Sequence, residues 1–297
     1  MKTYDTFAKW ILLIMPCLFI LAACQKSIQQ NNSDTQEPDI NTQKKIEMNS
    51  MNISNTSQSD ESEMFNLVME NEASDLDEFK QDCPERTFIP SRHDYPHTVI
   101  IDYGSGCTDK FGRVKKGKLM ITYSAPMTEP GAVSVTTFEN FYIDDAKIDG
   151  RHVIEHLAPT TDNFPHFSHL ANRTVQYPDG ASSDEVSNKL YVQTEGGNTS
   201  QHKDDGFTIF GESTGKIYAF GFHILYAAKI NNNDPLHNSV ECEFSDKGSE
   251  NSMIYLGQKL LINAKVDYGD GNCDNDAIVT SNNLTVHVKL PLEVWPF

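Results

Sequence analysis

The residues best suited to metal chemistry are four histidines in one short region. His152 and His156 belong to an H-x-x-E-H sequence, the pattern that places two zinc ligands one turn apart on a protease helix. This run follows Gly150 in a β-like context, and in a strand positions four apart are separated by about 13 Å. His166 and His169 follow in a Phe-Pro-rich loop and would contribute only if the fold gathered them. A metal-dependent hydrolase is therefore the least favoured function, and the sequence favours a protein without enzymatic activity.

A second candidate metal site is an acidic loop near the C-terminus. Four oxygen-bearing side chains fall at alternate positions there, as the ligands of a calcium loop do: Asp270, Asn272, Asp274 and Asp276. The pattern then departs from a calcium loop, because Asn275 replaces the glycine and Ser281 replaces the bidentate glutamate. A polar hairpin turn accounts for the same composition. Calcium is the only cofactor that the sequence leaves open.

One basic cluster stands out in an acidic chain. It consists of Arg113, Lys115, Lys116 and Lys118. The cluster could bind a carboxylate or a sulfated sugar, or it could form a solvated face that balances nearby acids. The formal net charge of −18 would repel phosphates, which argues against a nucleic-acid partner.

The N-terminus has the features of a bacterial lipoprotein signal. Lys2 and Lys9 precede an apolar run at 10–22, which is short for a bilayer span and ends in Leu-Ala-Ala-Cys at Cys24. Residues 1–23 are therefore predicted to be a signal peptide, and Cys24 to receive lipid. The membrane is then a partner through the anchor rather than through a spanning helix.

Four cysteines remain after the signal and the lipidated residue are set aside: Cys83, Cys107, Cys242 and Cys273. An even number in an exported protein predicts disulfides. Three connectivities are possible, and the sequence does not choose among them. We favour Cys83–Cys107 and Cys242–Cys273, because each pair flanks one copy of an Asp-Tyr-Gly sequence.

The mature chain divides into three predicted parts. Residues 24–61 are rich in Asn, Gln, Ser and Thr and are expected to form a disordered tether. Residues 62–80 carry apolar side chains at three- and four-residue steps, which predicts an amphipathic helix that packs on its own domain rather than on a partner. Residues 81–297 form the third part, a β domain.

The β domain is predicted from alternating apolar and polar residues punctuated by turn sequences. Leu119, Ile121 and Tyr123 alternate with polar residues, and later runs are rich in Val, Ile, Thr, Tyr and Phe. Sequential strands joined by turns favour an antiparallel meander. The expected fold is all-β, a curved open sheet or partial barrel, with a two-sheet β-sandwich as the alternative.

Two related segments bracket this domain. The first reads IIDYGSGCTDKFGRVKKGKLMITY and is followed by EPG and FENFYIDDAKIDG, and the second reads VDYGDGNCDNDAIVT. Together with the lipobox and the polar tether, they resemble a family of Bacteroidota-type outer-membrane lipoproteins whose activity is uncharacterised. The resemblance covers about a fifth of the chain, within 98–150 and 267–280. It implies an exported, β-rich lipoprotein of the outer membrane and assigns no functional residue.

Three functions follow from these observations. The first is a non-catalytic, lipid-anchored envelope module that binds a glycan or an envelope protein or serves a structural role. The second is a carrier that holds a lipid or other apolar ligand in a half-barrel. The third is the metal-dependent hydrolase built on the histidine region. The sequence does not indicate whether the domain faces the periplasm or the cell surface.

Overall fold

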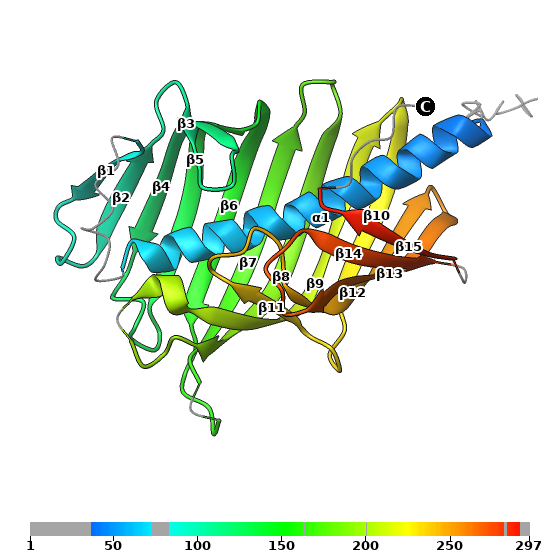
Figure 1. Ribbon diagram of the computed structural model, residues 1–297. Helices are drawn as coiled ribbons and strands as arrows, with labels where there is room; N and C mark the ends of the chain where they lie inside the picture. The colour runs from blue at the N-terminus through cyan, green and yellow to red at the C-terminus, as the bar shows by residue number, and fades with distance from the viewer. Residues whose placement is uncertain (1–36, 73–82, 163, 200, 282–283, 292–297) are drawn as a thin grey trace, which may run out of the picture. The chain divides into compact units, whose positions relative to one another are not determined.

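The computed structural model describes residues 37–72, 83–162, 164–199, 201–281 and 284–291. The described residues from Ile40 onward form one compact unit, which contains an antiparallel sheet and one long helix (Figure 1). The predicted signal peptide and Cys24 lie outside the described residues. No helix in the described ranges is long and apolar enough to cross a membrane.

The sheet contains fifteen strands and is not a closed barrel, which confirms the predicted antiparallel meander. Neighbouring strands follow the chain order with few exceptions, because most connections are short turns. The strands are β1 (Glu85–Ile89), β2 (His97–Asp102), β3 (Cys107–Thr108), β4 (Val114–Tyr123), β5 (Val133–Ile143), β6 (Ala146–His156), β7 (His166–Gln176), β8 (Ser182–Glu195), β9 (Gly206–Ala219), β10 (Phe222–Ile230), β11 (Leu236–Ser239), β12 (Lys247–Leu256), β13 (Lys259–Asp270), β14 (Asp276–Ser281) and β15 (Leu284–Lys289).

Two short strands depart from the simple order. β3 pairs only with β4, and β11 lies between the start of β9 and the start of β12. A short 3-10 turn, η2 (His202–Asp204), lies between β8 and β9. As a result, the β3–β4 turn, η2 and the segment after β11 surround one cavity, which is described in the next subsection.

The strands bury one face and expose the other. In β7 and β8, buried and exposed side chains alternate over most of the strand. Such alternation is typical of an antiparallel sheet with one face in contact with the rest of the protein. The covered face carries large apolar side chains, and also charged ones such as Arg173 and Lys189.

Helix α1 (Ile40–Glu70) lies across this face of the sheet (Figure 1). Its bounds differ from those of the predicted helix at 62–80, and the expectation of a disordered tether is wrong for residues 40–61. Near the end of this polar range, Ser57, Asp60 and Glu61 pair with buried cations of the sheet. Residues 73–80 of the predicted helix lie outside the described residues.

The C-terminal part of α1 is fixed by an aromatic cluster. The Phe65 ring stacks on Tyr191 with centroids 4.1 Å apart and contacts Phe207 edge-on at 4.9 Å. Phe65 and Val68 are fully buried, as expected for a helix that packs on its own domain. Aromatic pairs of this geometry add about 0.5–1.5 kcal/mol each beyond the buried area.

Two disulfides join the cysteine pairs that were favoured from the sequence. Cys83–Cys107 spans 24 residues and Cys242–Cys273 spans 31, with Cα atoms 5.8 and 5.4 Å apart. Both pairings are confirmed. The first fixes the entry to β1 against β3, and the second fixes the β11–β12 loop against the loop after β13.

Candidate functional site

The interface between α1 and the sheet is unusually polar. The middle of the helix buries serines, an asparagine and acids, whereas the facing strands bury arginine and lysine. Helix acids therefore meet sheet cations. A buried charge without a partner costs several kcal/mol of folding free energy. Removal of either member of such a helix–sheet pair would therefore destabilise the fold.

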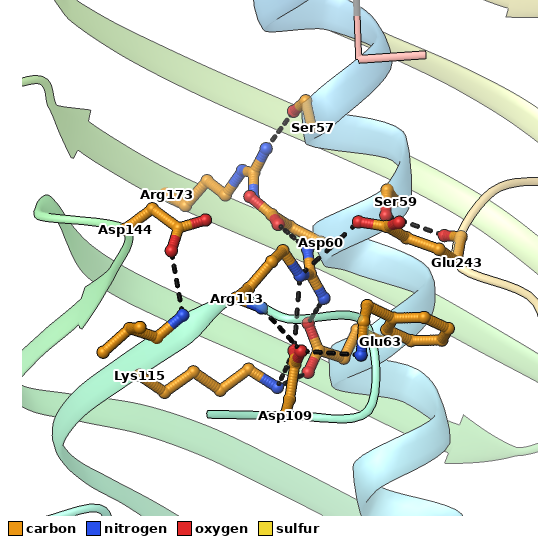
Figure 2. Close-up of polar contacts among 12 residues, drawn as sticks. Ser57, Ser59, Asp60, Glu63, Asp109, Arg113, Lys115, Asp144, Arg173 and Glu243 are labelled. Carbon is orange, nitrogen blue, oxygen red and sulfur yellow. Dashed lines mark hydrogen bonds and ion pairs between the residues drawn. The ribbon is translucent and has the colours of Figure 1, made fainter. Parts of the chain in front are cut away.

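Asp60 of α1 lies between two arginines of the sheet (Figure 2). Its Oδ1 accepts a hydrogen bond from Arg113 Nη1 at 3.1 Å, and its Oδ2 accepts one from Arg173 Nη1 at 3.3 Å. Arg173 also donates to Ser57 of the helix and lies 3.7 Å from Glu185 of β8. These contacts hold the helix in one register on the sheet.

Glu61, one residue further along α1, pairs with Lys189 of β8. It also accepts a hydrogen bond from Ser187 at 2.9 Å. Burial favours the neutral carboxyl, but the Lys189 charge, a hydrogen bond with Glu185 and the Arg173 charge together hold the pKa of Glu61 below its ordinary value. Glu61 is therefore charged in the folded protein at neutral pH.

The four residues of the basic cluster predicted from the sequence form ion pairs with acidic side chains. Arg113 and Lys115 pair with Glu63 of the helix and with Asp109 of the β3–β4 turn (Figure 2). The other two members have partners on the sheet: Lys116 with Asp145 and Lys118 with Asp102. The structure thus supports the interpretation in which these cations balance nearby acids rather than bind a sulfated ligand.

A cavity of about 300 Å³ lies beside this cluster. Three parts of the chain line it: the C-terminal half of α1, the β1–β4 region, and the segments around η2 and β11. Cys83, Cys107 and Cys242 are among the lining residues, so both disulfides fix its walls. Its volume is at the lower end of the range for small-ligand sites.

The lining includes two buried residues with unpaired polar atoms. His202 Nδ1 is 2.8 Å from Asp205 Oδ2, while its Nε2 has no hydrogen-bond partner within the described chain. Asn238 Oδ1 likewise has none in that part of the structure. The two residues are only 6% and 3% exposed, so water does not freely solvate them. Buried polar atoms of this kind are usually hydrogen-bonded, and their exceptions call for an explanation.

The four histidines singled out by the sequence lie in or beside strands, and only two of them meet. His152 Nδ1 and His169 Nε2 are 3.0 Å apart beneath α1. Burial lowers the pKa of His152 well below its ordinary value and that of His169 to about 3, so both are neutral. His156 contacts the Met127 carbonyl, and His166 pairs with Asp162. No group of three His, Cys, Asp or Glu side chains suited to a metal occurs among the described residues.

The acidic loop follows β13, and its side chains bond locally. Asn272 Nδ2 donates to Asp270 Oδ1 at 3.0 Å, Asp274 Oδ1 accepts the Asp276 amide at 2.9 Å, and Lys289 pairs with Asp276 at 2.5 Å. A shallow hollow borders this loop. The hydrogen bonds are those of a polar turn, and calcium binding by this loop stays a prediction.

The two buried cavity residues with unpaired polar atoms, His202 and Asn238, could not have been selected from the sequence. His202 and Asp205 stand three apart in a polar stretch, and Asn238 lies in an unremarkable strand. Only the fold brings these two chain segments to the end of α1. The chain has no significant match to a protein-family model, a curated protein or a solved structure.

Proposed function

We propose that this chain is a lipid-anchored envelope lipoprotein of the outer membrane that acts as a non-catalytic binding module. Its ligand, a glycan or a segment of an envelope protein, occupies the cavity at the end of α1. The observation that carries the proposal is the cavity itself. It has a volume of about 300 Å³, walls from three parts of the chain, and both disulfides beside it.

Ion pairs and two disulfides hold the walls of this cavity, which suits recognition. Arg113 makes ion pairs with four acids, drawn from α1, the β3–β4 turn and the β11–β12 loop. A preformed site loses little conformational entropy when it binds. The anchor follows from the lipobox at Cys24 and keeps such a module at the envelope.

The carrier alternative has less support. A carrier needs an apolar hollow on the covered face of the sheet, and α1 occupies that face with serine, asparagine and acidic side chains. Removing the helix would leave Arg173 and Lys189 without their acidic partners. The uncovered face would therefore place unpaired cations among its large apolar side chains, which suits an apolar ligand poorly.

The test is site-specific photo-crosslinking of the full-length chain in living cells. A diazirine amino acid replaces Asn66, which lines the cavity, or Lys45, an exposed residue near the start of the same helix. We expect a discrete adduct at position 66 that is absent at position 45. Equal adducts at the two positions, or none at 66, would contradict binding in the cavity.

The anchor is tested separately in the same cells. Alkyne-palmitate labelling should mark the wild-type chain and be lost in a Cys24→Ser variant. Retention of the label in that variant would refute lipidation at Cys24 and leave the result at the cavity unaffected.

A further inference from the structure

We infer that one end of the sheet docks on the lipid bilayer to which Cys24 anchors the chain. The contact is made by the tip of the β9–β10 hairpin, Phe220, and by three side chains on the outer face of the neighbouring strands. Together these four residues form the docking patch: Phe220, Leu225, Tyr255 and Leu260. This inference rests on the lipid anchor of the proposed function and names the surface by which the folded domain meets its membrane.

Three apolar side chains of the patch lie in one row across the sheet. Leu225 of β10 is directly opposite Tyr255 of β12, and Tyr255 is opposite Leu260 of β13. Side chains that are directly opposite in an antiparallel sheet share one face and contact each other. Leu225 is 42% exposed and Leu260 is 46% exposed, whereas the alternate residues Ile224 and Ile254 are buried. The row is therefore on the outer face, which α1 does not cover.

Phe220 is exposed in a backbone conformation that suits it poorly. Ala219 pairs with Phe222, so Phe220 and Gly221 form the whole turn, with φ of 56° and 81°. Two-residue turns of this kind favour Asn-Gly, because a bulky side chain at positive φ is disfavoured. The other non-glycine residues with positive φ in the described ranges are Asn or Asp. Strained positions of this kind concentrate at functional sites, which indicates that the exposed ring has a binding role.

The strands that carry the patch are free of carboxylates. The chain has 42 acidic residues, yet none occurs within 213–233 or 251–266. Lys216 is opposite Leu225, and Lys259 comes directly before Leu260. Lipid phosphates, which the acidic remainder of the surface would repel, are therefore not repelled here. Apolar side chains flanked by lysines suit the boundary between headgroups and acyl chains.

Helix α1 begins at the same end of the sheet. The Phe65 ring stacks on Tyr191, whereas Ser57, about two turns earlier in the helix, contacts Glu185. Tyr191 and Glu185 belong to one strand, β8, and Glu185 is the nearer of the two to the β7–β8 turn. Toward its N-terminus, α1 therefore runs to the end of the sheet that carries the β7–β8 and β9–β10 turns, as Figure 1 shows.

Only a short length of chain separates the predicted anchor from this helix. Residues 25–39 connect Cys24 to α1, since residues 40–61 are helical. Such a segment spans at most about 55 Å when fully extended. The anchor therefore confines the start of α1 near the bilayer and raises the effective concentration of the patch there. Asn66, at the cavity, lies about 40 Å further along α1, so docking leaves the cavity open to water.

The experiment is photo-crosslinking of the lipidated full-length chain in vesicles of phosphatidylethanolamine and phosphatidylglycerol. A diazirine phenylalanine replaces Phe220, which is 48% exposed, or Phe164, which is 44% exposed but lies between β6 and β7, at the opposite end of the strands. We expect phospholipid adducts, identified by mass, at position 220 and no more than background at position 164. Equal yields at the two positions, no adduct at position 220, or an adduct there to a second copy of the chain overturns the inference.

A substitution at the hairpin tip separates docking from folding. Phe220→Asn removes the ring and supplies the residue that this turn favours before glycine, so thermal stability should be unchanged or higher. With the diazirine residue at position 260 instead, Phe220→Asn should lower the yield of phospholipid adduct about tenfold, because half of a phenylalanine side chain no longer enters the membrane. Phe164→Asn is the matched control and should leave that yield unchanged. An unchanged yield in the Phe220→Asn chain would also overturn the inference.

The proposed function and the inference fail in distinguishable ways. The alkyne-palmitate label reports the anchor, and a chain without the label would refute both the anchor and the docking that rests on it. A labelled chain without a phospholipid adduct at position 220 refutes the docking alone. The ligand adduct expected at position 66 differs in mass from a phospholipid adduct and tests the cavity separately.

Discussion

The loops that begin at Asp102 and Asp267 share the sequence Asp-Tyr-Gly and the same hydrogen bond. In each loop the aspartate Oδ1 accepts from the amide two residues ahead, at 2.8 Å from Gly104 and 3.1 Å from Gly269. Both glycines have positive φ, of 54° and 97°, a region that side chains disfavour. Asp102 also pairs with Lys118 of the neighbouring strand, Asp267 pairs with Lys265 of its own strand, and each Asp-Tyr-Gly sequence is followed by a disulfide cysteine.

The two tyrosines differ in what they contact. Tyr103 packs against Phe141 with ring centroids 5.7 Å apart, and its hydroxyl makes no hydrogen bond within the described chain. Tyr268 donates from its hydroxyl to Glu250 at 3.1 Å and lies 3.4 Å from the Asn55 side-chain oxygen of α1. One loop therefore lines the cavity, while the other contacts the middle of the helix.

This difference shows what a repeated sequence does and does not determine. The Asp and Gly residues determine the turn, because they act through bonds inside the loop. The role of the tyrosine depends on strands that are distant in the chain. Equivalent mutations in the two turns should therefore change stability by similar amounts. Removing the two tyrosine hydroxyls should change stability by different amounts.

The largest expected effect is loss of either disulfide. Cys83→Ser with Cys107→Ser, and Cys242→Ser with Cys273→Ser, should each lower the free energy of unfolding by about 3–4 kcal/mol in the chain-entropy model. The loops of 24 and 31 residues differ too little to separate the two effects. Urea unfolding of the two double variants measures this. A difference of more than about 1 kcal/mol would mean that one disulfide also supports native contacts that the other does not.

A smaller effect is expected from removing the tyrosine hydroxyls. Tyr268→Phe takes away the donor to the buried Glu250 carboxylate and should cost about 1–3 kcal/mol. Tyr103→Phe removes a hydroxyl that has no hydrogen-bond partner among the described residues and should change stability by less than about 0.5 kcal/mol. Equal losses in the two variants would contradict the different roles assigned to the tyrosines.

The sheet could be predicted from the sequence because its signals are local. Alternating residues such as Leu119, Ile121 and Tyr123 indicate strands, and short turns between strands imply a meander. The cysteine pairing was favoured because each pair flanks one Asp-Tyr-Gly sequence, although the sequence alone left three connectivities open. The helical state of α1 before Ser62 was not predictable, because Asp60 and Glu61 pair with Arg173 and Lys189, more than a hundred residues later.

The candidate site was harder to predict from the sequence than the sheet was. The basic cluster was visible, but its partner Glu63 lies in α1, about fifty residues earlier in the chain. The pairing that neutralises the cluster therefore could not be read from local charge. His202 and Asn238 have no distinguishing pattern, and what singles them out is an unpaired atom in a buried wall. Such a property exists only in the folded chain.

The pH dependence should distinguish the two loops further. Burial raises the pKa of Glu250 above its ordinary value, although Lys189 and the Tyr268 hydrogen bond oppose the shift. The folded state then holds this proton more tightly than the unfolded state. Stability from this group is present below the unfolded pKa, near 4.5, and is lost as the pH rises toward the folded value. Glu250→Gln should flatten this decline in urea unfolding between pH 4.5 and 7, and an unchanged decline would rule Glu250 out as its source.

The smallest effect concerns Asp102, and it has the opposite sign. The Gly104 amide lowers the pKa of Asp102 most, followed by the hydrogen bond from Lys118. Stability from this carboxylate is present above its unfolded pKa, near 3.8, and is lost as the pH falls toward the folded value. Asp102→Asn should therefore reduce the loss of stability between pH 4 and pH 2. Lys118→Met should reduce it less, because the Gly104 amide remains. If Lys118→Met had the larger effect, the ion pair rather than the turn would govern the titration of this loop.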